Sequence, residues 1–290
     1  MSYADKLFVN MCDDILTNGT NTKNQAVRPH WSDGTPAYTI KQFGIVNRYD
    51  LRKEFPAITL RRTAIKSAID EILWIYQLNS NNVHDLHSHI WDSWADEKGS
   101  IGKAYGYQIG KEYVHHKQQV GLIHNNIYMN QIDAVLYDLK NQPFSRRIMT
   151  NMMNFDDLHE MNLQPCCYSC TFNVTDEGGD KLVLNMILNQ RSQDVLTANN
   201  WNVVQYACLL MMIAQVSNMI PGQLVHVIAD AHIYDRHVPL VKELITRKQY
   251  EAPIVTIDDT ITDFYKFTTD SFKVENYQHG EQIKNIPVAI

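Results

Sequence analysis

The chain has 290 residues, of which 44% are hydrophobic and 20% charged, and its formal net charge is −6. This composition is typical of a soluble globular enzyme, and the negative charge argues against general nucleic-acid binding. The N-terminal 16 residues include three aspartates, unlike a secretory signal, and the longest apolar stretch, around 206–216, is too short to span a bilayer. We therefore expect a cytoplasmic protein that needs neither membrane nor nucleic acid.

Helical and strand-like patterns alternate along the chain. In chain order, they predict helices at 2–18, 64–78 and 131–139, a short strand at 147–151, a pair of strands at 168–174 and 182–188 joined by a turn at 176–180, a helix at 201–218 capped by Asn199 and Asn200, a strand at 224–228 and a helix at 238–247. No repeat or linker divides them. The pattern predicts a single α/β domain over residues 1–290.

The most informative position is Cys166, which follows Pro165 and opens an apolar stretch, with Arg191 on a neighbouring predicted element. A thiolate is the nucleophilic form of cysteine, and an adjacent cation stabilises it. For a lone cysteine, a buried structural role is the more common alternative. The five cysteines are an odd number, with three crowded at 166–170, which argues against a disulfide framework and favours a reducing compartment.

Other residues suit anion or hydroxyl binding. Arginines in settings suited to a phosphate are Arg28, Arg61, Arg146, Arg147 and Arg191, although surface ion pairing is the alternative for each. His232 and Tyr234 lie on one side of an extended segment and can bond one hydroxyl; a pair of half-buried aromatic rings is the alternative. Cys167 and Cys170 have metal-site spacing, but on a strand they are expected to face opposite sides, so no metal site is predicted.

In this order, the motifs resemble the thymidylate synthase family from about residue 28 to residue 290. The matching positions are 71–74, 90–95, 104–106, 145–147, 163–166, 190–194, 202, 230–234 and 287–290. The segment at 31–37 resembles the branch that bacilli and their phages carry. The resemblance implies an α/β (α+β) single domain with a mixed β-sheet flanked by helices, in which one sheet face forms a homodimer.

The resemblance also implies methylation of dUMP, with Cys166 adding to carbon 6 of the uracil ring. The residues implied to bind dUMP are Arg28, Arg191 and Ser192 at the phosphate, Asn202 at the uracil edge, and His232 and Tyr234 at the sugar hydroxyl. Arg146 and Arg147 are implied to reach the site of the partner subunit. Arg191 is further implied to lower the pKa of the Cys166 thiol.

The one-carbon donor implied by the resemblance is the co-substrate 5,10-methylenetetrahydrofolate, with no metal. This reduced folate is implied to contact Asp194, Trp91 and Trp94, and to leave its glutamate tail near Arg61. Glu71 is implied to organise proton-carrying waters, and Tyr105 to position a water near carbon 5. The terminal carboxylate of Ile290 is implied to close over both substrates.

Three positions depart from the family pattern. Cys167 stands where histidine is common, Ala198 replaces a glycine, and the large Trp201 is expected to form an apolar wall on the folate side. These departures keep open a hydroxymethylase in which water replaces hydride, acting on dUMP or, less readily because of Asn202, on dCMP. A catalytically inactive nucleotide-binding dimer is the remaining alternative.

Overall fold

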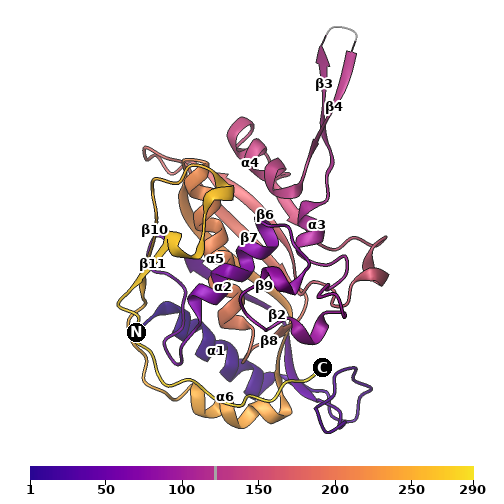
Figure 1. Cartoon of the computed structure of the whole chain (residues 1–290). Helices are drawn as coiled ribbons and strands as arrows, with labels where there is room; N and C mark the ends of the chain where they lie inside the picture. Colours follow the sequence, from indigo (N-terminus) through magenta and orange to yellow (C-terminus); the bar gives the residue numbers. More distant parts are fainter. Residues whose placement is uncertain (121–122) are drawn as a thin grey trace.

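The computed structural model describes residues 1–120 and 123–290 as one mixed α+β fold (Figure 1). The α-helices are α1 (Tyr3–Asn18), α2 (Ile65–Tyr76), α3 (Gly106–Gly110), α4 (Gln131–Asn141), α5 (Asn199–Val216) and α6 (Val238–Leu244). The strands are β1 (Thr20–Asn21), β2 (Thr39–Asp50), β3 (Tyr113–Val120), β4 (Ile123–Met129), β5 (Met149–Asn151), β6 (Cys167–Thr175), β7 (Val183–Gln190), β8 (Gln193–Asp194), β9 (Ile220–Tyr234), β10 (Ile254–Ile257) and β11 (Phe272–Glu275). In the described part of the chain, no helix is both long and apolar enough to cross a membrane.

A seven-stranded mixed sheet organises the fold in the order β1-β2-β9-β7-β6-β5, with β8 also paired to β9. Its neighbours are antiparallel except that β7 and β8 run parallel to β9. A parallel pair needs a crossover connection, and α5 supplies it between β8 and β9. Thr39 and Asp50 at the two ends of β2 lie opposite Tyr234 and Gln223, so β2 pairs with most of β9.

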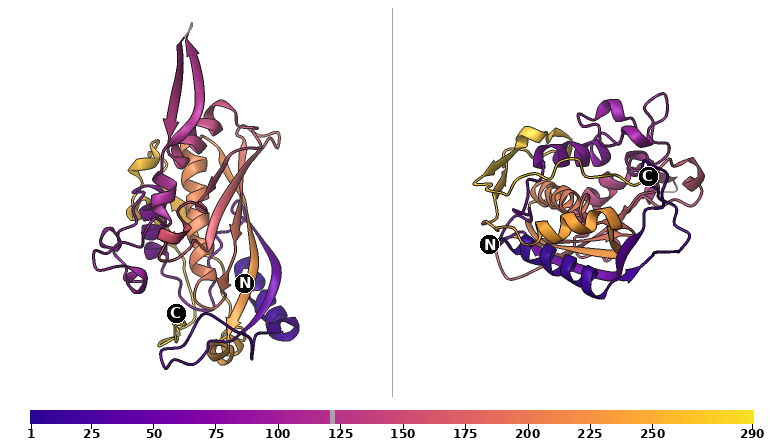
Figure 2. Two further views of the ribbon diagram at one scale, coloured as in Figure 1. Left: turned by 90° about the vertical axis from the view of Figure 1, so that its right-hand side faces the viewer. Right: turned by 90° about the horizontal axis from the view of Figure 1, so that it is seen from below.

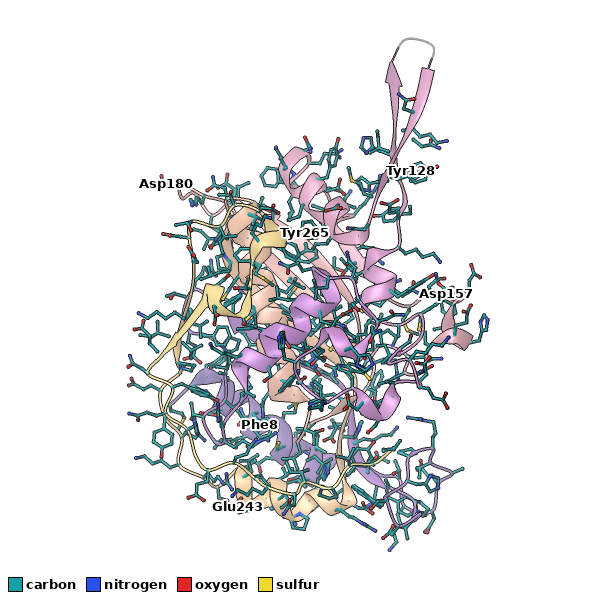
Figure 3. All side chains as sticks on the ribbon, in the orientation of Figure 1. Phe8, Tyr128, Asp157, Asp180, Glu243 and Tyr265 are labelled. Carbon is teal, nitrogen blue, oxygen red and sulfur yellow. The ribbon has the colours of Figure 1, made fainter. Side chains whose placement is uncertain are left out.

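The main helices cover one face of this sheet. Figure 2 shows α5 stacked on the strands and α2 beyond α5, and contacts of α5 with β9, β7 and α2 agree. On the same face, Asn47 of β2 lies opposite His226 of β9, and its Nδ2 donates to Met11 Sδ of α1 (3.6 Å). Phe8 of α1 (Figure 3) is 1% exposed in this core. The helix α5 is apolar around its circumference because both the sheet and α2 bury it.

The opposite face of the sheet carries an exposed apolar row. Across the strands, Val225 lies opposite Ile187, Ile187 opposite Thr171, and Thr171 opposite Met149. Ile187 and Met149 are 41% and 47% exposed, and Val46 of β2 is 49% exposed. Thr171 separates Ile187 from Met149, so the face is not apolar throughout, but exposed apolar side chains gathered from several strands of one open sheet face indicate an interaction surface.

Most predicted elements are confirmed to within a few residues, including the single mixed α+β domain type. The predicted cap of α5 is wrong: the helix begins at Asn199, and Ala198 precedes it without a side-chain bond. Asn199 and Asn200 are instead buried, and their amides bond each other (3.3 Å). The predicted strand at 224–228 is too short, because polar residues such as His232 interrupt the apolar pattern of β9 without ending its pairing.

The apolar pattern missed β2 and the β3–β4 hairpin. The hairpin projects away from the body (Figure 1), and Tyr128 on it is 59% exposed. Tyr113 and Val114 are also exposed, and a ribbon that exposes its apolar residues needs no apolar alternation, so its sequence carries little strand signal.

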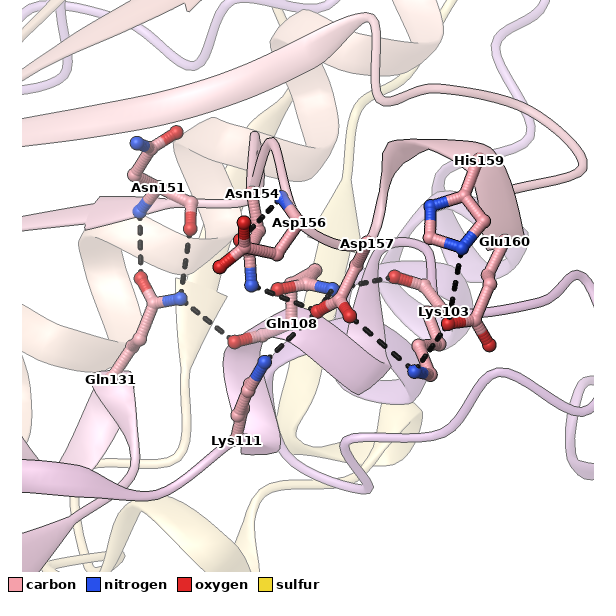
Figure 4. A network of polar contacts seen from close by, with 10 residues as sticks. All are labelled: Lys103, Gln108, Lys111, Gln131, Asn151, Asn154, Asp156, Asp157, His159 and Glu160. Carbon is pink, nitrogen blue, oxygen red and sulfur yellow. Dashed lines mark hydrogen bonds and ion pairs between the residues drawn. The ribbon is translucent and has the colours of Figure 1, made fainter.

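A buried carboxylate anchors the segment between β5 and Cys166 (Figure 4). Asp157 Oδ2 accepts hydrogen bonds from Gln108 Nε2 of α3 (3.0 Å) and from Lys111 Nζ (2.9 Å). Lys103 Nζ donates to Oδ1 (3.4 Å). The hydrogen bonds from Gln108 and the two ammonium groups lower the pKa of Asp157 to about 2. This carboxylate therefore fastens α3 to the loop that leads into β6.

We expect Asp157→Asn to lower the Tm by several degrees at neutral pH, because Gln108 and two lysines lose their charged acceptor. The folded pKa of Asp157 lies below the ordinary value of about 3.9. Its contribution to stability is therefore present above that ordinary value and is lost as the pH falls toward the folded pKa. The Tm difference between the two proteins should shrink as the pH is lowered, measured by calorimetry. Asp156→Asn, at the exposed neighbour, is the control, and a difference independent of pH would contradict this role.

Candidate active site

Cys166 and Arg191 lie side by side because the strands next to them pair. Cys166 immediately precedes β6, Arg191 immediately follows β7, and the two strands are antiparallel neighbours. The Arg191 backbone N–H donates to the Cys166 carbonyl (3.0 Å), and Arg191 Nη2 lies 3.8 Å from Cys166 Sγ. The guanidinium also donates to the carbonyls of Pro165 (Nε, 3.0 Å) and Gln164 (Nη2, 2.7 Å). The loop that carries the thiol thus holds the cation beside it.

Tyr105 contacts the same loop. Its hydroxyl oxygen accepts a hydrogen bond from the Cys166 backbone N–H (3.1 Å). Tyr105 has φ +47° and ψ −107°, a conformation that costs energy for any residue with a Cβ. It precedes Gly106, where a Cβ would overlap the carbonyl oxygen of Ser80. Strain of this kind persists where the surrounding structure fixes a functional side chain.

Burial and nearby positive charge act in opposite directions on the pKa of the Cys166 thiol. Burial raises its pKa, whereas Arg191, the Tyr105 hydroxyl and Arg28 lower it; burial is the largest effect, and the net shift is upward. The expected influence of Arg191 is present, but it does not exceed the effect of burial. The other four cysteines are each at most 4% exposed, so Cys166 is the accessible thiol.

Glu71 of α2 is a buried carboxyl group behind the nucleophile loop. Burial raises its pKa to about 7, although a hydrogen bond from Trp201 opposes the shift. Trp201 Nε1 donates to Glu71 Oε2 (2.6 Å). Besides the apolar ring surface expected of it, Trp201 thus has a polar contact that the sequence did not predict. A carboxyl group that titrates near neutral pH can both accept and donate a proton.

An aromatic cluster adjoins Glu71. The Trp91 ring packs edge-on against Tyr105 (4.8 Å between centroids) and Trp94 (5.7 Å). Trp91 is 7% exposed, and its Nε1 is buried without a hydrogen-bond partner. Trp94 is half-buried. The cluster supplies edge-packed aromatic rings beside Glu71, and Trp91 is among the groups that lower the pKa of that carboxyl group.

The amide of Asn202, in the first turn of α5, is held from both ends. Its Oδ1 accepts from Gln190 Nε2 (3.2 Å), and its Nδ2 donates to Gln205 Oε1 (3.0 Å). Gln190 Oε1 in turn lies 2.7 Å from Nε2 of His226. Burial lowers the pKa of His226 to about 3, so the ring is neutral and Nε2 carries the hydrogen. Asn202 keeps one donor and one acceptor site, which match a ring N–H beside a carbonyl.

The end of β9 brings two further predicted residues together. The rings of His232 and Tyr234 lie edge to face with centroids 5.0 Å apart, and His232 Nδ1 lies 2.8 Å from Asp230 Oδ1. The exposed Arg28 is close enough for its charge to lower the pKa of both Cys166 and Tyr234. Burial and nearby carboxylates nevertheless raise the Tyr234 pKa to about 12, so its hydroxyl keeps its proton.

Asp194 of β8 lies opposite His232 in the sheet. Its Oδ2 accepts from Thr197 Oγ1 (2.7 Å) and its Oδ1 from the Leu196 backbone N–H (3.0 Å). Burial raises the pKa of Asp194, but contacts with His237 and Thr197 outweigh it, so the pKa is lowered and the group stays ionised.

Arg61 is 7% exposed and lies between this turn and the C-terminal segment. Its Nη2 donates to the Leu196 carbonyl and its Nη1 to Gln282 Oε1 (3.4 Å), while Nε is buried without a partner. Burial lowers the pKa of Arg61, although the nearby Asp194 charge opposes the shift.

The C-terminal residue pairs with the loop that carries Arg28. The His30 backbone N–H donates to a terminal oxygen of Ile290 (2.8 Å), and the Ile290 N–H donates to the His30 carbonyl (3.0 Å). Upstream, the Pro287 carbonyl lies 2.7 Å from His237 Nε2. The chain end thus lies across residues expected at the phosphate and folate sides.

Two further pairs of residues named from the sequence remain: Arg146 with Arg147, and Cys167 with Cys170. Arg146 and Arg147 are exposed just before β5, and neither contributes to the pKa shift of Cys166 within the described chain.

The expectation that Cys167 and Cys170 face opposite sides is wrong. A β-bulge after Cys167 inserts Tyr168 as an extra residue, so both thiols are buried. Among residues 1–120 and 123–290, no group of three or more His, Cys, Asp and Glu side chains could hold a metal ion.

The sequence reasoning gave no role to several residues that hold the site together. These are His30, Gln190, Gln205, His226 and His237. His30, Gln190, Gln205 and His237 lie within five residues of predicted site residues, which is the one local signal available for them. Nothing local marks His226, because its partner is 36 positions away.

We expect Cys166 to be the thiol that iodoacetamide modifies first in the native protein. In Arg191→Ala the pKa of Cys166 rises further, so the alkylation rate at neutral pH should fall roughly three- to tenfold and the rate–pH curve should move to higher pH. The alkylation rate of Arg191→Lys, which keeps the charge, should be closer to that of the wild type. Arg62→Ala, which removes another exposed arginine, should have the wild-type rate. An unchanged rate in Arg191→Ala would show that the guanidinium does not act on the thiol.

Comparison with known proteins gives a consistent result over the whole chain. The family model described as thymidylate synthase matches residues 6–290. The chain is 40% identical to thymidylate synthases of Bacillus subtilis subsp. natto and Bacillus phage phi3T, over 98% of each chain. Its structure resembles a thermostable thymidylate synthase A from Bacillus subtilis, with a TM-score of 0.89, 40% identity and 99% coverage of both chains. The predicted family is confirmed, and this chain belongs to the thymidylate synthase family.

Proposed function

We propose that the chain converts dUMP to dTMP by reductive methylation. The observation that carries this proposal is the pairing of Cys166 Sγ with Arg191 at 3.8 Å, in a chain that matches the thymidylate synthase family over residues 6–290. In the proposed reaction the Cys166 thiolate adds to carbon 6 of the uracil ring, and its elimination at the end restores the ring double bond. The co-substrate 5,10-methylenetetrahydrofolate supplies the one-carbon unit and the hydride.

The nucleotide would lie between the thiol and the end of β9. Arg28, Arg191 and Ser192 would bind its phosphate, since two guanidiniums and a hydroxyl offer several donors to a dianion. His232 and Tyr234 would bind the sugar hydroxyl. The fixed amide of Asn202 would bind N3–H and the adjacent carbonyl of uracil, an arrangement that disfavours cytosine.

Proton movement would fall to Glu71 and Tyr105. A carboxyl group with a pKa of about 7 is half ionised at neutral pH, so Glu71 can pass protons through water to the pyrimidine carbonyl. The Tyr105 hydroxyl, held at the backbone of Cys166, would position the water that removes the proton from carbon 5.

The residues expected at the folate fit such a ligand. The ionised Asp194 can accept from the donor edge of a pterin, and Trp91 and Trp94 offer ring faces for stacking. Arg61 keeps a buried unpartnered Nε, and the Ile290 carboxylate would close the site against water.

We also propose that the active unit is a homodimer formed by the apolar sheet face of Ile187, Met149 and Val46. That face is exposed in the single chain. Arg146 and Arg147 lie away from the chain's own thiol, and they would serve the phosphate site of the partner subunit. The single catalytic domain over residues 1–290 and a cytoplasmic location belong to the same proposal.

Incubation with dUMP and 5,10-methylenetetrahydrofolate should give dTMP and dihydrofolate, with the absorbance rise of dihydrofolate. The aromatic cluster and the C-terminal segment are expected to exclude water from the intermediate, so hydride transfer wins. Mass spectrometry of the nucleotide is the deciding measurement, with Cys166→Ala as the inactive control. A product heavier than dTMP by one oxygen, without the absorbance rise, would establish the hydroxymethylase instead.

Mixing two inactive variants tests the dimer. After subunit exchange, Cys166→Ala and the double variant Arg146→Ala/Arg147→Ala should recover up to roughly a quarter of wild-type activity, since half of the dimers are mixed and each has one intact site. Cys166→Ala mixed with the triple variant Cys166→Ala/Arg146→Ala/Arg147→Ala is the control, because no dimer in that mixture has an intact cysteine and it should recover no activity. If mass spectrometry verifies exchange and no activity is recovered, the arginines act in their own subunit's site or lie outside both sites.

A further inference from the structure

The last four residues of the C-terminal segment are held by few polar contacts, whereas Ile283 and Ile286 before them pack against the core. Most of residues 281–290 are exposed, and they form no helix or strand. The segment runs past α6 to end near the loop of residues 28–37 (Figure 1). The polar contacts of its last four residues in the described chain are those of Ile290 with His30 and that of Pro287 with His237. Loss of one contact can therefore change how often the segment is closed.

His237 lies under this exposed segment and is itself 0% exposed. Its Nε2 lies 2.7 Å from the Pro287 carbonyl oxygen, and its Nδ1 lies 3.5 Å from Asp194 Oδ1, within ion-pair distance but poorly aligned for a hydrogen bond. The rings of Trp31 and Tyr234 pack edge-on against it, with centroids 5.7 and 5.5 Å away. A histidine that faces acceptors with both nitrogens is best satisfied as an imidazolium.

The charge balance around the ring favours that form. Burial lowers the pKa of His237, but the Asp194 carboxylate, the Pro287 carbonyl and the charge of Asp235 outweigh burial, so the pKa is raised. Trp31 Nε1 donates to Asp235 Oδ1 (3.0 Å), which fixes the second carboxylate near the ring. His237 thus links the half-buried carboxylate of Asp194 to the last residues of the chain.

We propose that His237 is a positioning residue that holds the C-terminal segment over Asp194. Through the Pro287 carbonyl it keeps Ile290 paired with His30, and through Asp194 it fixes the carboxylate expected at the folate. The inference deepens the proposed function, since it assigns a residue to closure of the same site. Loss of His237 should weaken folate binding more than nucleotide binding, because Asp194, the acceptor expected at the folate, is the site residue that faces the His237 ring directly.

The first test measures the chain end without substrates. Hydrogen exchange at the Ile290 amide, which donates to His30, should be faster in His237→Leu than in the wild type, and His237→Gln, which keeps one donor for the Pro287 carbonyl, should lie between them. Lys242→Ala, at an exposed position of α6, is the matched control. Circular dichroism checks that each variant is folded. Equal Ile290 exchange in folded His237→Leu and wild type would overturn the proposal whether or not the protein makes dTMP.

The second test is a double-mutant cycle with removal of residues 287–290. In the full-length chain, His237→Leu should raise the KM for the folate roughly tenfold, the cost of one charge-assisted hydrogen bond, with a much smaller change in the affinity for dUMP. In the truncated chain the same substitution should add little further, because its partner is gone. If His237→Leu raises the folate KM equally in the full-length and truncated chains, the link through Pro287 is overturned. If the wild-type chain makes no dTMP, only the proposed function is overturned.

Discussion

The pairing of β6 with β7, and of β7 with β9, is the constraint on which the site depends. It sets Cys166 beside Arg191 at one end of the sheet, and the parallel step to β9 brings His232 and Tyr234 to the same end. The crossover that this parallel step requires is α5, whose first turn carries Trp201 and Asn202. Sheet topology thus gathers residues from distant parts of the chain.

The surroundings then shift the pKa values of two carboxyl groups of the site in opposite directions. Glu71 lies in an apolar surrounding with one strong donor, and its pKa rises to about 7. Asp194 is half-buried, and His237 and the Thr197 hydroxyl keep it ionised. Two carboxylates of the same site can therefore serve as a proton carrier and as a fixed acceptor.

The site also depends on segments that lie far from its centre. The Asp157 network fastens α3 to the loop of Cys166, and the last residues of the chain lie across the loop of Arg28. Both are polar connections on an otherwise apolar scaffold. Their loss is expected to disturb the placement of site residues more than the stability of the core, because the packing of α5 between the sheet and α2 does not involve them.

The sequence by itself determined the family, the helices with strong apolar periodicity, and the pairing of Cys166 with Arg191, because each depends on local pattern or on short motifs in a fixed order. It missed β2, which buries the polar Asn47 and exposes the apolar Val46, and the β3–β4 hairpin, whose Tyr113, Val114 and Tyr128 are exposed. Only the tertiary structure showed that Trp201 binds Glu71, that His226 fixes Gln190, and that His237 lies between Asp194 and Pro287. Such contacts join residues tens of positions apart, and a buried polar side chain carries no sign in the sequence of which distant partner satisfies it.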